Sequence, residues 1–411
     1  MMQHAEALSE VLANSVTLPS RVMTLSKSLG HYLAEPLVAP FSLPRFDNSA
    51  VDGYGFRADD FREVTTKEPV TLHPFESIRA GEHSEQCLPV NGVVKVLTGA
   101  PIPPGVDSVI MREELEVGGK VSLNRTPIVG ENIRHAGREV LKGTELLPVG
   151  TKITPSVIGM LATFGMSRVN VIRKPRISLF SSGDELVVVG KTLDRPSQIY
   201  DSNLPMVTAE LSQLGIAPRT TYRLPDNLSA TLQSLRLAMK HSDIVVTCGG
   251  ISMGEYDFIR TAALELGIAE KFWKVAIKPG KPLFFGTHGT KSRPKLFFGL
   301  PGNPVAVMVT LEQFVLPAIR KLMGSTAAVL PMQSGILMQP ITKKAGRLDF
   351  VRVVAVWADD HYEITPMSAQ ESHMLSGIAV ANALLHFPEA CEVLPAGATA
   401  SFQWLSSRHG G

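Results

Sequence analysis

Hydrophobic and polar positions alternate with two different periods along this chain of 411 residues. From about residue 176 to 324, short apolar runs of strand character alternate with longer segments of helical periodicity. The expected strands cover residues 177–180, 220–223, 243–248 and 296–298, and the expected helices cover residues 202–215, 227–241, 256–266 and 303–322. Strands that alternate with helices predict a three-layer α/β domain in this part of the chain.

The segments on either side of this domain follow a different pattern. Residues 27–175 combine short strands with many prolines and glycines, and one helix is expected over residues 156–164. After Pro331, polar and apolar residues alternate one by one, which predicts a small β-barrel or sandwich. The first twelve residues are typical of an amphipathic helix rather than of a signal peptide.

Composition and charge narrow the class of protein. An apolar fraction of 44% with 19% charged residues is typical of a soluble globular enzyme, and the length predicts about two to four domains. The formal net charge is +2 and no basic stripe or tail is present, so we expect no nucleic-acid partner. Three cysteines without paired spacing argue against a disulfide framework, and no segment is built to span a membrane. We therefore expect a cytoplasmic protein without membrane contact.

Three glycine-rich signatures lie between residues 247 and 304. They read TCGGISMGEYD, KVAIKPGKP and GLPGNP, and each follows or interrupts an apolar run. Glycine lets the backbone approach a ligand closely, and exposed N–H groups at turns and helix starts bind anions. The three signatures together predict a site for a phosphorylated, anionic ligand.

Two lysines stand in the second signature, at Lys278 and Lys281, on a turn fixed by Pro279 and Gly280. Such a turn can aim both ammonium groups at one oxyanion or phosphate, where charge-assisted hydrogen bonds are strongest. The alternative is a pair of solvated lysines at the tip of a hairpin. Their position between two apolar runs favours the binding interpretation.

Carboxylates follow several of the predicted strands. Glu255 and Asp257 stand at the expected start of a helix, where each could either cap the helix or hold Mg²⁺. Glu185, Asp201 and Asp226 come at other strand ends or loops, and carboxylates gathered at one sheet edge repel one another unless a metal or a donor-rich ligand lies between them. Ordinary capping and turn chemistry is the alternative for each of them.

A polar run, FDNSAVDGY over residues 46–54, lies between apolar stretches in the N-terminal part, and LTGAP over residues 97–101 is a weaker candidate of the same kind. Asp47, Asn48, Ser49 and Asp52 could form turns or could bind the polar edges of a heterocycle. The eleven histidines are scattered, and we expect most of them to be structural or exposed. Metalloprotease, serine-hydrolase and Walker-A motifs are absent from the sequence.

In order and spacing, these runs resemble the molybdopterin molybdenumtransferase family, which includes the C-terminal region of gephyrin. The resemblance runs from about residue 40 to 373. The matching runs are FDNSAVDGY (46–54), TGAP (98–101), SGDEL (182–186), QIYDSN (198–203), GGISMGEYD (249–257), AIKPGKP (276–282), GLPGNPV (299–305) and GRLDF (346–350).

The resemblance implies a multidomain fold of α/β and β domains in an elongated homodimer. A three-layer α/β molybdopterin-binding domain would follow β-rich N-terminal domains and precede a small C-terminal β-barrel. The implied boundaries are 1–46 with 147–175 for a helical linking domain, 47–146 for a β-rich inserted domain, 176–327 for the α/β domain and 328–411 for the barrel.

The resemblance also implies an activity. Adenylylated molybdopterin and molybdate would bind, AMP would be released in a Mg²⁺-dependent step, and molybdenum would enter the dithiolene. Lys278, Lys281, Ser252 and Arg347 would hold molybdate or phosphate, while Asp47 and Thr98 of the partner subunit would complete a shared cleft. The residues implied for Mg²⁺ and the adenylylated pterin are Glu185, Asp226 and Asp257. The residues implied for the rest of the cofactor site are Gly249, Gly250, Gly254, Pro301, Gly302, Asn303 and Ser372.

The chain departs from the family pattern in three places. Gly137 is followed by Arg138 and Glu139 where glutamate and aspartate are usual, Ala306 replaces a common serine, and Glu371 replaces a usual glycine. The changes at Arg138 and Glu371 are expected to bear on local geometry and on the reaction rate. Ala306 removes one possible oxyanion donor. The family assignment does not depend on them.

Two other functions stay open. A non-catalytic scaffold is one, since gephyrin uses this architecture for assembly, but the set of lysines and carboxylates favours an enzyme. Molybdopterin adenylyltransferase is the other, but that activity needs only the α/β domain and would leave both flanking regions unexplained. We also expect transient contact with a molybdopterin adenylyltransferase and with proteins that deliver the cofactor to molybdoenzymes.

Overall fold

The computed structural model describes residues 1–117, 120–251 and 258–406. The chain divides into two compact units. The larger unit contains residues 1–35, 149–159 and 167–411, and the smaller unit contains residues 36–148 and 160–166. The division into four domains that the resemblance implies stays a prediction.

The larger unit is built on a mixed β-sheet with the strand order β18-β15-β19-β23-β22-β20. The first four of these strands are parallel, and β22 and β20 continue the sheet as antiparallel strands. Their bounds are β15 Ile177–Ser182, β18 Thr220–Leu224, β19 Ile244–Cys248, β20 Ala269–Trp273, β22 Phe284–Thr290 and β23 Arg293–Leu300. The predicted strands are therefore present, and the apolar runs on both sides of the lysine turn lead into an antiparallel extension of the sheet.

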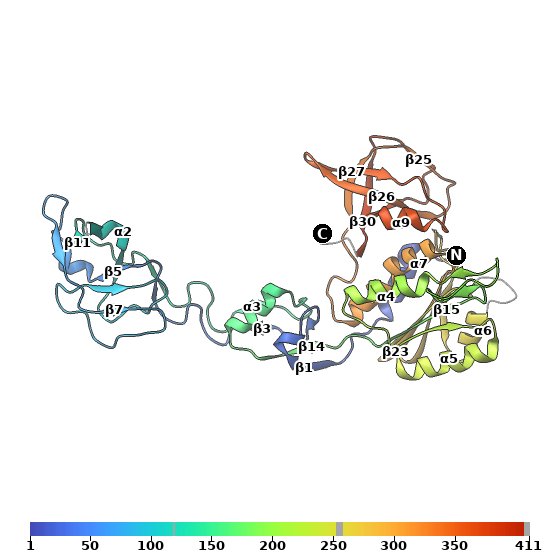
Figure 1. Cartoon of the computed structure of the whole chain (residues 1–411), viewed down its shortest axis with the longest axis horizontal. Helices are drawn as coiled ribbons and strands as arrows, with labels where there is room; N and C mark the ends of the chain where they lie inside the picture. Colours follow the sequence, from blue (N-terminus) through green and yellow to red (C-terminus); the bar gives the residue numbers. More distant parts are fainter. Residues whose placement is uncertain (118–119, 252–257, 407–411) are drawn as a thin grey trace. The chain divides into compact units, whose positions relative to one another are not determined.

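Helices cover both faces of this sheet, as Figure 1 shows. Side chains of β15 alternate between two cores: Ile177 and Leu179 lie in the core with α4 and α7, whereas Phe180 lies in the core with α5 and α6. The helix bounds are α1 His4–Ala13, α4 Asn203–Gln213, α5 Leu228–His241, α6 Phe258–Glu265, α7 Pro304–Thr310 and α8 Leu316–Leu322, with a π-helical segment over Leu311–Val315. The predicted three-layer α/β domain is confirmed.

The starts of these helices follow from local chemistry. Asp201 Oδ1 accepts hydrogen bonds from the backbone N–H groups of Asn203 and Leu204, at 3.0 and 3.1 Å, and so caps α4. Asn227 caps α5 by accepting from Ala230 N at 3.0 Å. Pro304 occupies the first turn of α7, where its missing N–H costs no hydrogen bond.

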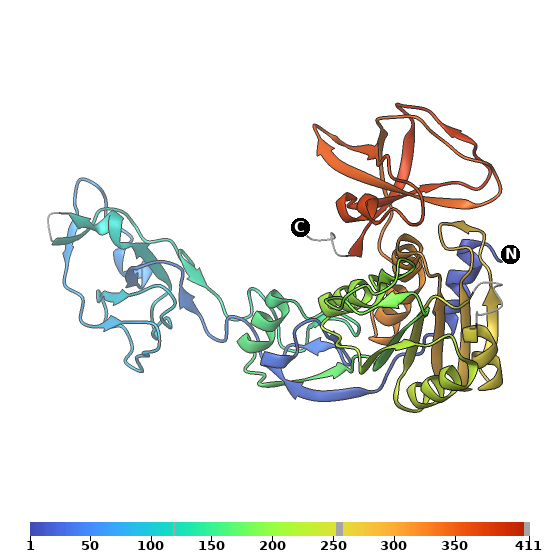
Figure 2. The same cartoon turned by 45° about the vertical axis from the view of Figure 1, so that its right-hand side comes forward.

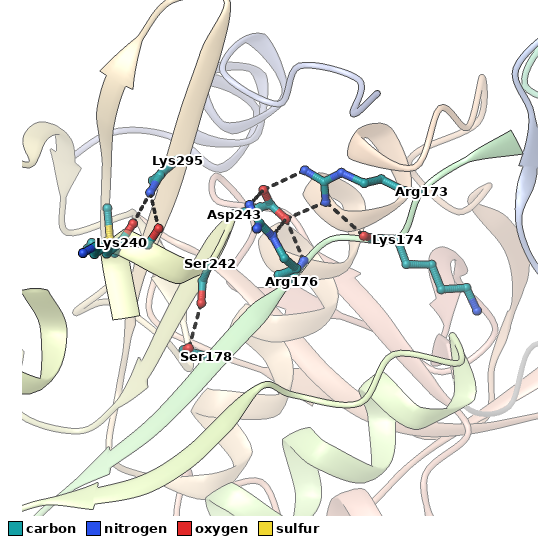
Figure 3. A network of polar contacts seen from close by, with 9 residues as sticks. Arg173, Lys174, Arg176, Ser178, Lys240, Ser242, Asp243 and Lys295 are labelled. Carbon is teal, nitrogen blue, oxygen red and sulfur yellow. Dashed lines mark hydrogen bonds and ion pairs between the residues drawn. The ribbon is translucent and has the colours of Figure 1, made fainter. Parts of the chain in front are cut away.

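A network of charged residues fixes the amino end of the parallel strands (Figure 3). The Asp243 carboxylate accepts from Arg173 at 2.7 and 2.9 Å and from Arg176 at 3.0 and 3.2 Å. Burial disfavours the ionised carboxyl, but both guanidinium groups and the Arg176 N–H outweigh it and hold the pKa of Asp243 well below its usual range. Because these residues precede β15 and β19, the network ties the starts of two neighbouring strands together.

A closed barrel follows the sheet domain, and its strands are drawn in red in Figure 2. Neighbouring strands pair in the order β26-β27-β24-β30-β28, and β28 pairs again with β26. The strand bounds are β24 Gln333–Leu337, β26 Leu348–Ala358, β27 His361–Pro366, β28 Ala383–Phe387 and β30 Thr399–Trp404. Beside them lie helix α9 Leu375–Val380 and the pair β25 Ile341–Thr342 with β29 Val393–Leu394. Of the two predicted alternatives, barrel or sandwich, the barrel is confirmed.

Short strands make up the rest of the larger unit. A sheet of order β1-β14-β2 comprises Ser20–Thr24, Arg168–Ile172 and Tyr32–Leu33. The pair β16 Leu186–Val187 and β17 Ile199–Tyr200 lies beyond the end of β15. Helix α3 covers Pro155–Thr163, one residue from the predicted start, and residues 160–163 of this helix belong to the smaller unit.

The smaller unit is rich in short strands, as predicted. Its principal sheet has the order β7-β8-β5-β9, and Tyr54 and Phe56 of β5 lie in its core. The bounds in this unit are β3 Leu37–Val38, β4 Asn48–Ser49, β5 Gly53–Phe56, β6 Val70–Leu72, β7 Ser77–Ile78, β8 Val94–Val96, β9 Ser108–Met111, α2 Arg112–Leu115, β10 Glu116–Val117, β11 Lys120–Leu123, β12 Ile133–Arg134 and β13 Glu145–Leu147. Within the described part of the chain, no helix has the length and apolar character needed to cross a membrane.

Candidate functional site

The candidate site lies along one edge of the α/β sheet. Parallel strands place their carboxyl ends on the same side, so the segments that follow β15, β18, β19 and β23 meet there. The lysine turn precedes β22, and Phe284 at the start of β22 pairs with Gly299 near the end of β23. The fold therefore brings the turn to the edge that carries the glycine-rich and acidic segments.

Asp226 is held at this edge by uncharged donors. Its Oδ1 accepts from Ser182 Oγ at 3.1 Å, and its Oδ2 accepts from the Asp184 backbone N–H at 3.2 Å. The Asp184 carboxylate accepts in turn from the Asp226 N–H at 3.2 Å, which locks the two loops together. Among the described residues, no lysine, arginine or histidine forms an ion pair with Asp226 or with the exposed Glu185.

The glycine-rich segments pack backbone against backbone. Gly249 and Gly250 have φ angles of +90° and +69°, a region that favours glycine. A side chain at Gly249 would place its Cβ 2.7 Å from the Ser182 carbonyl oxygen, so the close approach of the two strand ends also requires glycine. The Gly249 N–H donates to the carbonyls of Leu300 and Pro301, at 3.0 and 3.2 Å. The first and third signatures are thus joined by backbone hydrogen bonds from Gly249 to Leu300 and Pro301.

Polar side chains fix the loop around Gly302. Asn203 Nδ2 donates to the Gly302 carbonyl at 2.8 Å, and Asn303 Nδ2 donates to Ser372 Oγ at 2.9 Å. The Val305 N–H donates to the Ser372 carbonyl at 3.3 Å. Ser372 belongs to the segment after β27, so the barrel contributes to the edge that the sequence motifs predict. Asp201 caps a helix, and this is the alternative that the sequence left open for it.

Lys278 and Lys281 lie on the turn before β22, and both are exposed. Lys278 Nζ lies 3.8 Å from Asp349 Oδ2, and Lys343 Nζ lies 3.9 Å from Asp349 Oδ1. Arg347, two residues before Asp349, is partly buried, and its carbonyl accepts a hydrogen bond from Lys343 Nζ. Two predicted residues, Lys278 and Arg347, therefore both lie near Asp349.

Asp349 and Lys343 were not predicted from the sequence. Burial raises the pKa of Asp349, although Lys343, Lys278 and Arg347 oppose the rise with their positive charges. Burial lowers the pKa of Lys343, and the Asp349 carboxylate opposes that change. Asp349 stands inside the GRLDF run, but a buried aspartate in a strand gives no signal until the strand's neighbour is known.

Asp47 and Thr98 lie in the smaller unit, where the two N-terminal motifs are side by side. The Gly99 N–H donates to the Ser49 carbonyl at 2.9 Å, and the Ile102 N–H donates to the Asp47 carbonyl at 2.9 Å. The structure therefore places the two N-terminal motifs next to each other.

The two motifs also hold their carboxylates by hydrogen bonds. Asp47 accepts from the Ala136 N–H at 2.7 Å and contacts His135 Nδ1 at 2.9 Å, and these two contacts hold the pKa of Asp47 below its usual range. The backbone N–H and hydroxyl of Thr98 donate to Asp52 at 2.8 and 2.7 Å and lower its pKa in the same way.

Three predicted site residues, Ser252, Gly254 and Asp257, lie outside the described residues. Among those described, no group of three His, Cys, Asp or Glu side chains is arranged to hold a metal ion. The oxygen donors at the edge still fit a hard cation, because Asp226 and Glu185 are carboxylates without an ion-pair partner in the described chain.

The three departures from the family pattern lie in different surroundings. Arg138 is exposed and, with Arg134, Glu139 and Pro44, lines a cavity of about 370 Å³ in the smaller unit. Ala306 is buried in α7, so the serine hydroxyl that is common at this position would lie inside the fold. The Glu371 side chain is exposed, and its carbonyl accepts from the buried Arg352 at 3.3 Å.

Comparison with known families assigns both the α/β sheet with its glycine-rich strand ends and the small closed barrel to a class of molybdopterin biosynthesis proteins. Residues 2–165 match the MoeA N-terminal region (domain I and II), residues 178–321 match a probable molybdopterin binding domain, and residues 334–405 match the MoeA C-terminal region (domain IV).

Relatives confirm the assignment over nearly the whole chain. A molybdopterin molybdenumtransferase from Haemophilus influenzae is 34% identical over 93% of each chain, and one from Bacillus subtilis is 33% identical over 94% of this chain and 90% of its own. A crystal structure of the molybdopterin biosynthesis MoeA protein from Pyrococcus horikoshii matches with a TM-score of 0.82, at 27% identity over 98% of this chain and all of the other.

The chain belongs to the MoeA family, and the resemblance predicted from the sequence is confirmed. Membership of this family makes it a transferase of molybdenum cofactor biosynthesis.

Proposed function

We propose that this chain transfers molybdenum from molybdate into adenylylated molybdopterin, with Mg²⁺-dependent release of AMP. The observation that carries the proposal is the lysine turn at the carboxyl edge of the α/β sheet, next to Arg347 and Asp349 of the barrel. The full-length relatives named molybdopterin molybdenumtransferase support it, and they argue against an isolated adenylyltransferase.

Charge explains why these residues suit the substrates. Molybdate is a dianion, and the pterin phosphate and the adenylate bring more negative charge into the same cleft. Lys278, Lys281 and Arg347 offset that repulsion with charge-assisted hydrogen bonds. Gly302 is exposed, and glycine at such a turn lets a phosphate approach the backbone N–H groups closely.

A Mg²⁺ ion would be held by Glu185, Asp226 and Asp257. When bound, it would stabilise negative charge on a phosphoryl oxygen as the adenylate leaves. The hydrogen bonds from Ser182 Oγ and the Asp184 N–H orient the Asp226 carboxylate before any cation arrives.

The working unit in this proposal is a cytoplasmic homodimer with a shared active site. Asp47 and Thr98 precede the α/β domain by many residues and lie in the smaller unit, whereas the lysine turn lies in the larger one. A two-fold partner would supply one set of these residues to each of the two sites. Transient contacts with a molybdopterin adenylyltransferase and with cofactor-delivery proteins complete the proposed role.

A turnover assay with adenylylated molybdopterin, molybdate and Mg²⁺ tests the proposal. AMP and active molybdenum cofactor are scored separately, and reactions without molybdate or without Mg²⁺ serve as controls. The proposal predicts both products in the complete reaction. AMP without active cofactor would contradict the transfer step, synthesis of adenylylated molybdopterin from ATP would favour the adenylyltransferase, and no turnover would favour the scaffold.

A further inference from the structure

Asp349 is a buried carboxylate placed between two lysines. It lies in barrel strand β26, and its side chain is 12% exposed. Lys278 Nζ lies 3.8 Å from one of its oxygens and Lys343 Nζ lies 3.9 Å from the other. The carboxylate therefore connects the exposed lysine of the candidate site to a lysine of the barrel interior.

Lys343 is anchored far more tightly than Lys278. Its side chain is only 3% exposed, and its Nζ donates to the carbonyls of Arg347 and Phe387. The same ammonium group lies 4.9 Å from the centre of the Phe387 ring. A buried cation held by two carbonyls and an aromatic ring gives Asp349 a fixed partner, so that the second carboxylate oxygen faces Lys278 from a fixed position.

The backbone strengthens this connection. Strand β21, which is Ile277–Lys278, pairs in parallel with Leu348–Asp349 of β26. The Leu348 N–H also donates to the Ala276 carbonyl at 3.0 Å. Lys278 and Asp349 are direct partners in this register, so the barrel holds both the main chain and the side chain of the residue before the turn.

We propose that Asp349 is a positioning residue that holds the Lys278 ammonium group ready for molybdate. The proposal rests on the function proposed above. Its carboxylate does not bind the anion, and its negative charge by itself opposes a dianion nearby. Positioning and simple electrostatics therefore predict opposite signs for the effect of removing that charge.

Asp349→Asn separates the two accounts, with molybdate binding to the purified full-length protein measured by calorimetry. If Asp349 positions Lys278, the Kd for molybdate rises about tenfold, although the site has gained one unit of positive charge. Tighter or unchanged binding in a folded variant would overturn the proposal. Asp360→Asn is the matched control: it removes the same charge from the same barrel at a side chain that is 93% exposed, and binding should stay unchanged.

If Asp349→Asn alone unfolds the barrel, Asp349→Glu, which keeps the charge but moves the carboxylate, replaces it in a double-mutant cycle with Lys278→Met. If Asp349 acts through Lys278, its replacement has no further effect on molybdate affinity once Lys278 is gone, and independent additive effects would refute it. The same cycle measured on thermal unfolding without molybdate tests the Lys278–Asp349 contact itself. Coupling in that cycle, with no molybdate binding by the wild type, would reject the proposed function while leaving the contact intact.

Discussion

Asp226 and Asp243 lie at opposite ends of the parallel strands of the α/β sheet, and their surroundings differ in kind. At the amino end, Asp243 is partly buried and bound by two guanidinium groups. At the carboxyl end, Asp226 accepts hydrogen bonds only from a hydroxyl and a backbone N–H among the described residues. The first carboxylate is already neutralised by protein cations, whereas the second keeps its charge available for a cation from outside.

The two ends of the parallel strands therefore differ in role: one end stabilises the fold, and the other carries the candidate site. Two arginines fix the starts of β15 and β19 through Asp243, so the charges at that end of the sheet are paired within the protein. At the other end lie glycine-rich backbone, the lysine turn and a carboxylate that has no ion-pair partner among the described residues, and in the proposed function these charges bind Mg²⁺ and anionic substrates. The predictions below test this division, beginning with the largest effect.

Lys281→Ala and Lys278→Ala should each weaken molybdate use strongly. Loss of one charge-assisted contact in a partly desolvated site should cost about 2–4 kcal/mol, or roughly 30- to 1000-fold in kcat/KM for molybdate. Because both lysines are exposed, the melting temperature should change little. Steady-state kinetics over a range of molybdate concentrations measures this effect. Unchanged molybdate dependence in both variants would show that the lysine turn does not bind molybdate.

Asp243→Asn should destabilise the fold without changing substrate affinity. Two guanidinium groups lose their carboxylate, and because both are partly exposed we expect a loss of about 2–3 kcal/mol in the free energy of unfolding. Chemical denaturation measures this loss, and an unchanged KM for molybdate in the folded variant is the expected control. A stable variant with an altered KM would show that Asp243 contributes to substrate binding rather than to stability.

The pH dependence of stability follows from the same carboxylate. The pKa of Asp243 is lower in the folded protein than in the unfolded chain, so its contribution is present above about pH 4 and is lost as the pH falls. Wild type should therefore lose more unfolding free energy than Asp243→Asn between about pH 6 and about pH 3. Parallel losses in the two proteins would show that Asp243 is not stabilising in its ionised form.

A smaller effect is expected from mixing two inactive chains. If Asp47 of the partner subunit completes each site, Asp47→Asn and Lys281→Ala chains should form mixed dimers with one intact site. With random exchange, about half of the dimers are mixed, so activity should recover to about a quarter of wild type. The two variants are refolded together and assayed, and subunit exchange is verified with distinct tags. Proven exchange without recovery would place both residues in one chain's site.

Local sequence was enough to predict much of the fold and part of the site. Helix caps such as Asn227, the strand before Gly249 and the Asn303–Pro304 start are short-range signals, and the structure contains each of them. The contact between Lys278 and Asp349 could not be predicted, because it depends on the pairing of β21 with a distant barrel strand. The contact of Asp243 with two arginines could not be predicted either, because Arg173 and Arg176 lie far from Asp243 in the sequence.

The most direct test of this division compares Asp226→Asn with Asp243→Asn in one experiment. AMP release is titrated with Mg²⁺, and the melting temperature is measured without metal. We predict that Asp226→Asn raises the Mg²⁺ concentration needed for half-maximal release about tenfold at an unchanged melting temperature, since one metal ligand is lost. Asp243→Asn should lower the melting temperature and leave the Mg²⁺ dependence as in wild type. The reverse pattern, with Asp226→Asn destabilised and equally impaired at every Mg²⁺ concentration, would contradict the account.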